Sequence, residues 1–362
     1  MKLNTRKILY VAVNDGLGVE NKIKGFCKAA EGEGYVVEIV VKVCSRLHER
    51  RLLMQNLLTT DAKYIVLRSM SSYSLFFLAY MMKARMQGKT IIVDQPSPMW
   101  NYAKELNNYP RSYFWKLSKK TFTYIGGPLF FLLSNRIVQY ADESAWFKMF
   151  CHDKTLLTGN GIDVDRIVLR KKKYPNGCDK LALVGVAACL WNWHGYDRVI
   201  RAMGEWKRKN RKPIVTFDIV GNDMVPDGHD LKELAMKEGV GDMVRFHGFQ
   251  SSEFLEDLYS RNTLAVASLG LFRKGLSTSS VLKTREYCLA GIPFIATGYD
   301  PDFPSKIPFR FEVSNDDSID DILMVFKCYC EKSDSFSDEV IRQYAIDHLS
   351  YKKKFKEIMR GL

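Results

Sequence analysis

The sequence predicts an α/β protein with two domains, each built on a parallel sheet of the Rossmann type. Residues 7–13 form a β-branched run that leads into Asn14-Asp15-Gly16-Leu17-Gly18. A helical stretch to about residue 32 and a second apolar run from Gly34 follow. Strand, glycine turn, helix and strand make a βαβ unit, whose two strands run parallel. The same order restarts at residue 181, and 362 residues suit two domains of ordinary size.

A basic segment separates the two predicted domains. Residues 169–177 read LRKKKYPNG, and charge, proline and glycine are typical of an exposed hinge. We therefore expect a first domain over residues 1–168 and a second domain over residues 178–344.

The remaining elements follow from apolar periodicity and turn residues. Strands are predicted at residues 64–68, 90–93, 136–139, 181–187, 215–221, 244–247 and 294–296. Helices are predicted at residues 74–85, 230–239, 253–259, 281–290, 319–332 and 337–359, with a further helix that ends near residue 207.

The composition narrows the classes of function. The formal net charge is +13, which attracts polyanions such as nucleic acid or an anionic membrane surface. No nucleic-acid-binding motif is present. No apolar run approaches the ~18 residues of a membrane span, and the N-terminus does not resemble a signal peptide. Eight scattered cysteines predict free thiols in the cytoplasm, and no Cys/His spacing predicts a zinc site.

The stretch 271–297, LFRKGLSTSSVLKTREYCLAGIPFIAT, has the layout of a diphosphate site. A helix over about residues 281–290 would begin after a run of Ser and Thr that can cap it, and would end at Gly291 and Pro293. Its unpaired N–H groups at Ser279, Ser280, Val281 and Leu282 favour an anion. An ordinary surface helix with a Lys/Glu pair would show the same pattern.

Three cations and one acid complete this predicted site. Arg273, Lys274 and Lys283 would stabilise the charge of a diphosphate. Glu286 lies three residues after Lys283 on the same helical face, where a carboxylate can hold a ribose diol.

The segment SVLKTREYCLAGIPFIAT resembles the nucleotide-sugar motif of GT-B glycosyltransferases, especially the retaining family-four type that makes bacterial surface polysaccharides. Glu286, Gly291 and Pro293 match the end of that motif. The first glutamate of the family motif would fall at Thr278, so the contact to the donor sugar departs from the family pattern. The resemblance implies a GT-B fold, with two Rossmann-like domains facing each other across a cleft and a C-terminal helix, about 345–362, packed back on the first domain.

The resemblance also assigns residues elsewhere in the chain. The glycine turn with Gly16 and Gly18 would approach the donor phosphate, and His194 stands where the family usually has a phosphate-binding lysine. Gly248 and Phe249 would contact the base. On the acceptor side, Arg68 ends a predicted strand, and Asp94 lies in a predicted loop where a solvated aspartate is the plainer interpretation.

A basic and aromatic segment follows at residues 109–136. It contains five Lys or Arg, with seven Phe, Tyr or Trp between the first and the last of these cations, and no acidic residue. This composition suits a segment lying on anionic lipid at the inner face of the plasma membrane. Core helices with a solvated basic face are the alternative.

Together these features predict a glycosyltransferase that moves a hexosyl group from a UDP- or GDP-linked sugar to a saccharide or lipid-linked acceptor, with retention and without a metal or other cofactor. Three alternatives stay open: a GT-B sugar-nucleotide epimerase, a non-catalytic GT-B subunit, and a nucleic-acid-binding protein.

Overall fold

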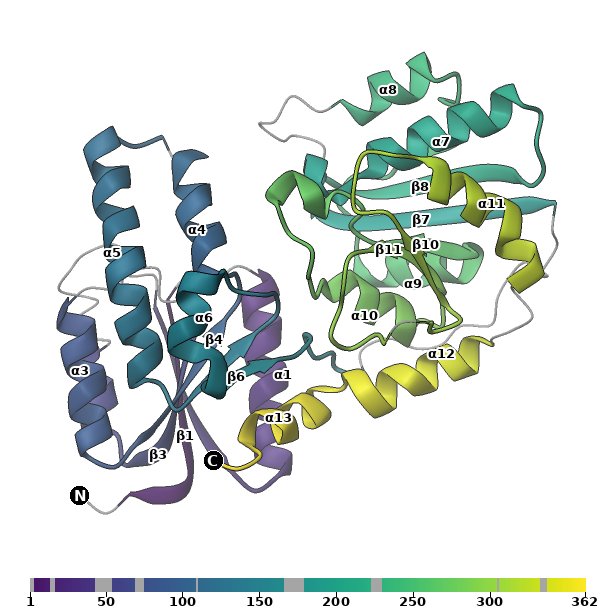
Figure 1. Ribbon diagram of the computed structural model, residues 1–362. Helices are drawn as coiled ribbons and strands as arrows, with labels where there is room; N and C mark the ends of the chain where they lie inside the picture. The colour runs from purple at the N-terminus through teal and green to yellow at the C-terminus, as the bar shows by residue number, and fades with distance from the viewer. Residues whose placement is uncertain are drawn as a thin grey trace. The chain divides into compact units, whose positions relative to one another are not determined.

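The computed structural model describes residues 3–13, 17–42, 54–68, 75–108, 110–165, 179–222, 230–304, 306–332 and 337–362 (Figure 1). The chain forms two compact units. Unit 1 contains Met1–Gly161 and Tyr351–Leu362, and unit 2 contains Ile162–Ser350. The predicted linker at residues 169–177 lies outside the described residues.

Unit 1 is built on a six-stranded parallel sheet with the order β2-β1-β3-β4-β5-β6. The strands are β1 (Asn4–Val13), β2 (Val36–Lys42), β3 (Ala62–Arg68), β4 (Thr90–Gln95), β5 (Arg136–Gln139) and β6 (Thr155–Leu157). The helices are α1 (Leu17–Gly32), α3 (Leu75–Met86), α4 (Met99–Glu105), α5 (Tyr113–Leu133), α6 (Ala145–Cys151) and α13 (Tyr351–Met359).

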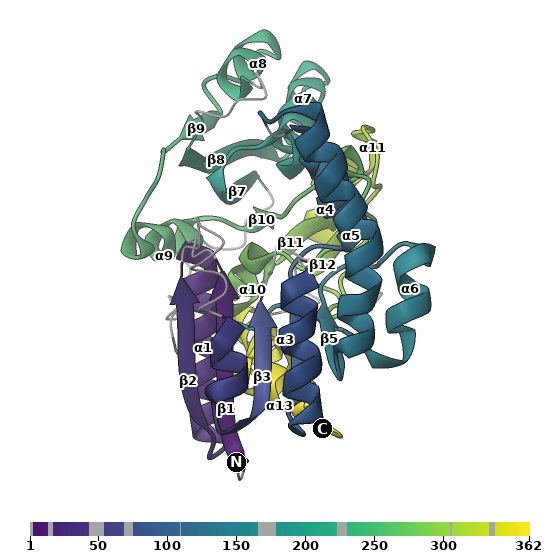
Figure 2. The ribbon, with the colours of Figure 1, turned by 90° about the vertical axis from the view of Figure 1, so that its left-hand side faces the viewer.

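Both faces of this sheet are covered, as the apolar strands require. Alternate residues of β1 belong to different cores: Leu9 and Val11 pack with α3, α5 and α6, whereas Ile8 and Tyr10 pack with α1 and α13. In Figure 2, α5 lies between α3 and α6, and these three helices form one layer on the sheet.

The C-terminal helix α13 joins unit 1 through aromatic packing. The ring of Phe355 lies 5.3 Å from that of Phe26. Beside it, a side chain at either Gly25 or Gly161 would collide with the ring of Tyr351. The two glycines therefore leave the space that this ring fills.

Unit 2 has a second six-stranded parallel sheet, with the order β12-β11-β10-β7-β8-β9. The strands are β7 (Lys180–Cys189), β8 (Ile214–Asn222), β9 (Val244–Phe246), β10 (Leu264–Val266), β11 (Phe294–Thr297) and β12 (Arg310–Val313). The helices are α7 (Tyr196–Arg208), α8 (Leu231–Lys237), α9 (Ser252–Arg261), α10 (Leu282–Leu289), α11 (Asp320–Lys332) and α12 (Asp338–Tyr344).

The strand order of unit 2 reverses between β7 and β10. From β7 the chain moves outward to β9, returns to β10 and moves outward on the other side to β12. In open parallel sheets, ligands bind beyond the carboxyl ends of the strands at such a reversal.

The structure confirms the two βαβ repeats and the helix at α10, and it corrects two predicted elements. The single helix expected over residues 337–359 is wrong: α12 passes into a π-helical turn, Ala345–Leu349, and α13 starts only at Tyr351. Between them Ser350 is extended and forms a parallel bridge with Ile162, which interrupts the helix. Strand β4 also continues to Gln95, so that Asp94 belongs to the strand and not to a loop.

Candidate functional site

The loops that follow β7 and β10 are joined to each other at the strand reversal. The backbone N–H of Leu269 donates to the carbonyl of His194 at 2.9 Å, and that of Gly270 donates to the carbonyl of Trp193 at 3.2 Å. Gly195 has φ 68°, and a Cβ there would lie 2.7 Å from the backbone nitrogen of Gly270. Only glycine permits both this conformation and this approach.

This junction brings four polar side chains together. His194 Nδ1 lies 2.9 Å from Lys283 Nζ and 3.2 Å from Ser268 Oγ. Lys283 Nζ also donates to the hydroxyl of Tyr196 at 3.1 Å. These side chains come from the β7 loop, the β10 loop, α7 and α10, and all four residues are buried.

The electrostatics of the cluster are unusual. Burial lowers the pKa of Lys283 to about 7, and the charge of Glu286 opposes this shift. Burial, followed by the charge of Lys283, holds the pKa of His194 far below its usual range. His194 is therefore neutral and can accept a hydrogen bond from the lysine. Among the described residues, no carboxylate lies within ion-pair distance of the Lys283 ammonium group.

The N-terminus of α10 lies next to this cluster in the chain. The residue that caps the helix is Val281, and its side chain makes no capping hydrogen bond. The expectation that the preceding Ser and Thr residues include the cap is therefore wrong. The reason is backbone pairing: Ser279 N–H donates to Tyr299, and Thr278 forms a bridge with Tyr299, so this segment is extended before the helix begins. Ser280 is buried and Leu282 is exposed.

A buried arginine that the sequence analysis did not identify holds α10 in place. Arg285 is 0% exposed, and its guanidinium group pairs with Asp300 and Asp302, at 2.7 Å from each. Two acids and one arginine in a loop–helix pair carry no distinctive sequence spacing. The pairing explains why the acids at 300 and 302 are not free carboxylates.

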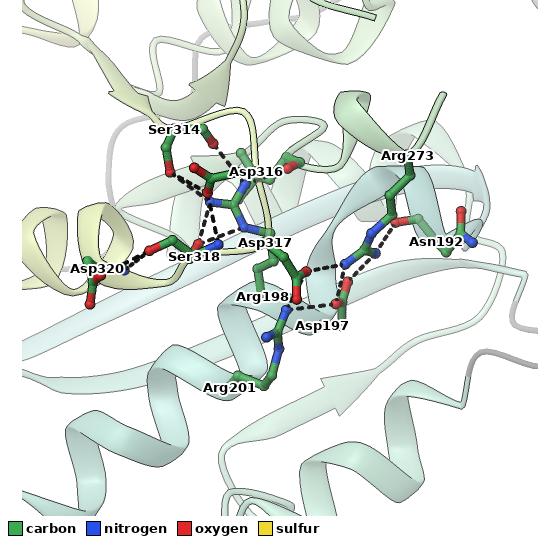
Figure 3. Close-up of polar contacts among 11 residues, drawn as sticks. Asn192, Asp197, Arg198, Arg201, Arg273, Ser314, Asp316, Asp317, Ser318 and Asp320 are labelled. Atoms are coloured by element: carbon green, nitrogen blue, oxygen red, sulfur yellow. Dashed lines mark hydrogen bonds and ion pairs between the residues drawn. The ribbon is translucent and has the colours of Figure 1, made fainter. Parts of the chain in front are cut away.

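Arg273 occupies a different position from the one expected of a diphosphate ligand. Its guanidinium group binds both carboxylate oxygens of Asp197, at 2.8 and 2.7 Å, and Asp317 at 2.9 Å (Figure 3). It also donates to the carbonyl of Asn192 at 2.6 Å. The hydrogen bonds that Arg273 donates to Asp197 raise the pKa of Arg273. Arg273 thus ties its own turn to the start of α7.

Arg198, which Figure 3 also labels, has a similar structural role. Arg198 is fully buried and donates to the carbonyls of Leu269, Ser314 and Ser318 at 2.5–3.1 Å. Lys274 is the more accessible cation: its ammonium group lies 4.9 Å from the centre of the Trp193 ring. Its charge also lowers the pKa of His194, which places it near the cluster.

The two residues predicted to contact the base lie further along the same sheet edge. Gly248 follows β9 with φ +66°, and a Cβ there would meet nothing within 4 Å. Phe249 is 72% exposed. Strand β9 is two strands from β7, about 10 Å at the usual strand spacing. Glu286 is half-buried on the second turn of α10.

In unit 1, Asp94 is at the centre of a buried ionic cluster. Its carboxylate accepts hydrogen bonds from Arg68 at 2.5 Å, Lys22 at 3.2 Å, Tyr10 at 3.0 Å and Tyr140 at 2.8 Å. The predicted solvated aspartate is therefore wrong, because β1, β3, α1 and the residue after β5 bring these groups to one buried point around Asp94 of β4. Although burial opposes ionisation, Arg68 and Lys22 keep the pKa of Asp94 well below its usual range.

Other predicted residues are not placed near either cluster. Gly16 lies outside the described residues, as do the loops that follow β1 and β3, and Gly18 lies in the first turn of α1. Ser268 and Tyr196 complete the His194–Lys283 cluster and were not singled out in the sequence. A Tyr directly after His-Gly is the one local signal that could have identified Tyr196. The described residues contain no group of His, Cys, Asp or Glu arranged to hold a metal ion.

Known proteins resemble this chain in sequence over one segment and in fold over nearly its whole length. Residues 171–301 match the family model "Glycosyl transferases group 1". A glycosyltransferase from Rickettsia africae is 14% identical, with a TM-score of 0.66 over 99% of this chain and 100% of that one. The apo form of the lipopolysaccharide outer core galactosyltransferase WaaB is 12% identical, with a TM-score of 0.61 over 98% and 100% of the two chains.

A trehalose-phosphate synthase from Burkholderia xenovorans, solved with glucose-6-phosphate, is 10% identical with a TM-score of 0.58 over 97% and 98% of the chains. No curated protein sequence shows significant similarity. The fold is GT-B. The segment that matches the family model includes all four residues of the His194–Lys283 cluster, which lies at the strand reversal of unit 2.

Proposed function

We propose that the protein transfers a hexosyl group from a nucleotide-diphosphate sugar, UDP- or GDP-linked, and that the diphosphate binds beside Lys283. One observation carries the proposal: a buried lysine contacts a neutral imidazole and a phenol, but no carboxylate among the described residues. The nearby charge of Glu286 offsets the burial of this ammonium group only in part, and a diphosphate would supply a counter-charge in direct contact.

The neighbouring groups fit the rest of such a donor. The uncapped N-terminus of α10, at Val281 and Leu282, adds a favourable dipole for an anion. Lys274 adds a second, more accessible cation. Glu286, on the next turn, is suited to the ribose diol, and exposed Phe249 offers an aromatic face to the base.

The chemistry assigned to these groups is charge stabilisation at the leaving diphosphate. As the bond to the sugar breaks, negative charge grows on the diphosphate, and Lys283 and Lys274 are positioned to stabilise it, which makes a bound metal unnecessary. His194 positions the lysine, and Arg273 positions the turn that carries Lys274. In a reaction with retention, the leaving phosphate itself takes the proton of the acceptor hydroxyl on the same face.

We assign the acceptor to a saccharide or lipid-linked saccharide of surface polysaccharide synthesis, bound at the sheet edge of unit 1. Arg68 and Asp94 end adjacent strands there, but they are bonded to each other. Their part is to fix the shape of this edge.

The test is donor binding by calorimetry across UDP-, GDP-, CMP- and dTDP-linked sugars, followed by product analysis with and without a saccharide acceptor. Glu286→Ala should weaken the preferred donor about 10- to 100-fold, the value of a charge-assisted hydrogen bond pair. Asp163→Ala, which removes a carboxylate from another loop, is the matched control and should change affinity little. Unaltered affinity in Glu286→Ala would refute the ribose role, and product from the donor alone would indicate an epimerase.

A further inference from the structure

The outer face of α3, α5 and α6 in unit 1 is unusually apolar. About half of the large hydrophobic side chains that are exposed in the described chain lie on these three helices. None of the described helices has the length and apolar composition of a membrane span. This surface therefore needs another explanation.

The exposed apolar residues of α5 form a stripe along its outward side, which Ser118 and Thr121 interrupt. Phe114, Leu117, Ile125, Leu129 and Leu132 are all exposed, with Phe114 at 80% and Ile125 at 63%. Phe114 and Leu132 are about five helical turns apart at 3.6 residues per turn, so that they point the same way. The opposite side of the C-terminal half is buried against the sheet through Phe130 and Phe131. The stripe is thus a second apolar face, turned away from the core.

The neighbouring helices extend this face. Met82 and Met86 of α3 are exposed, as are Trp146 and Met149 of α6. Trp146 is held by a specific contact: Pro128 has no N–H to donate to the carbonyl of Tyr124, and the indole N–H of Trp146 donates to that carbonyl at 3.2 Å. The indole is therefore anchored while nearly half of its surface stays exposed.

The charges around the apolar face are of one sign. Helices α3, α5 and α6 contain no Asp or Glu, and they carry the cations Lys83, Arg85, Lys116, Lys119, Lys120 and Lys148. Lys116 and Lys120 donate hydrogen bonds to Asn107 and lie on the inward side of α5, so the cations beside the exposed apolar residues are Lys83 and Arg85 of α3. Asp142, which pairs with Lys148 at 3.3 Å, is a nearby acid from a loop.

We propose that this face, defined by the outward side chains of α3, α5 and α6, docks the protein on an anionic lipid surface. An exposed apolar face with the cations Lys83 and Arg85 beside it and Trp146 within it matches the layers of a membrane interface. A second copy of the chain would bring the same cations together without acids to pair with them. The proposal is independent of the transfer reaction proposed above.

Vesicle co-sedimentation of the full chain tests the apolar part. Phe114→Ser with Ile125→Ser should lower partitioning onto phosphatidylcholine–phosphatidylglycerol vesicles at least about tenfold, because two side chains that would enter the interface are lost. Met236→Ser with Met324→Ser, which removes two exposed side chains of unit 2, should leave partitioning unchanged. Unchanged thermal unfolding in both variants shows that folding is intact.

Lipid composition tests the electrostatic part. Lys83→Gln with Arg85→Gln should weaken binding about fivefold per cation at low salt, whereas Lys237→Gln with Lys327→Gln should not. Equal recovery on vesicles with and without phosphatidylglycerol would overturn the proposal. Lipid binding that is unchanged in Phe114→Ser/Ile125→Ser would also overturn it. The same holds if vesicles recover no wild-type protein and sedimentation velocity shows a dimer that this variant dissociates.

Discussion

Each unit of the protein buries a lysine near the carboxyl edge of its sheet, but the two lysines have opposite surroundings. In unit 1, Lys22 lies 3.2 Å from the Asp94 carboxylate, and Arg68 binds the other oxygen of the same acid. In unit 2, the hydrogen-bond partners of Lys283 in the described part of the chain are His194 and Tyr196. Burial lowers the pKa of both lysines to about 7.

The comparison separates a structural ion cluster from a binding site. A buried ion pair is costly to break, because the remaining charges lose their partner. A buried cation with no anion in contact is itself unfavourable, and its retention favours a role that is completed by a ligand. Equal pKa values thus accompany different functions, and the contacts distinguish them.

The largest effect is expected from breaking the cluster in unit 1. Asp94→Asn leaves Lys22 and Arg68 buried without an anion, and should lower the free energy of unfolding by about 3–5 kcal/mol. Denaturant unfolding of the variant measures this loss. Asp142→Asn, at an exposed aspartate of the same unit, is the control and should lie within about 0.5 kcal/mol of wild type. An equally small loss for Asp94→Asn would remove the distinction between the two units.

The corresponding change in unit 2 should act on binding and not on folding. Lys283→Met removes a buried charge that contacts no carboxylate within the described ranges, so thermal stability should stay the same or rise. Affinity for the preferred nucleotide sugar should fall about 100-fold, because the diphosphate loses a charge-assisted bond in a buried site. Calorimetry tests the expected loss of affinity, and thermal unfolding of the same preparation tests the expected stability. A marked loss of stability with unchanged affinity would make Lys283 structural.

A smaller effect is expected from pH. Without a ligand, burial holds the pKa of Lys283 at about 7, and a bound diphosphate should raise it, so that binding takes up a proton. Affinity should be constant below pH 7 and then fall, by up to about tenfold per pH unit, as the free lysine loses its proton. The diphosphate of a nucleotide sugar does not titrate in this range. Lys283→Met should show a flat profile, and a wild-type profile equally flat from pH 6 to 9 would contradict the proton linkage.

Local sequence patterns were enough to predict the fold and the position of α10. The βαβ order depends on apolar runs and glycine turns, and the end of α10 depends on Gly291 and Pro293, all of which are local. Arg285 and Asp94 were not predicted as buried, because their partners come from other segments of the chain. The ion pairs of Arg273 were not predicted for the same reason, because its sequence neighbours give no sign that Asp197 and Asp317 approach it.

The backbone junction between Gly195 and Gly270 limits how this site can vary. Because the loops after β7 and β10 bond to each other through main-chain atoms, His194 and Ser268 cannot be shifted independently by changing a side chain nearby. Attempts to engineer a different donor preference would do better to alter the turn at Gly248, where a built Cβ meets open space and the neighbouring aromatic is exposed, although any side chain there must tolerate a positive φ. Main-chain bonds fix the part of the site proposed for the diphosphate, whereas the part proposed for the base, two strands away, has room for substitution.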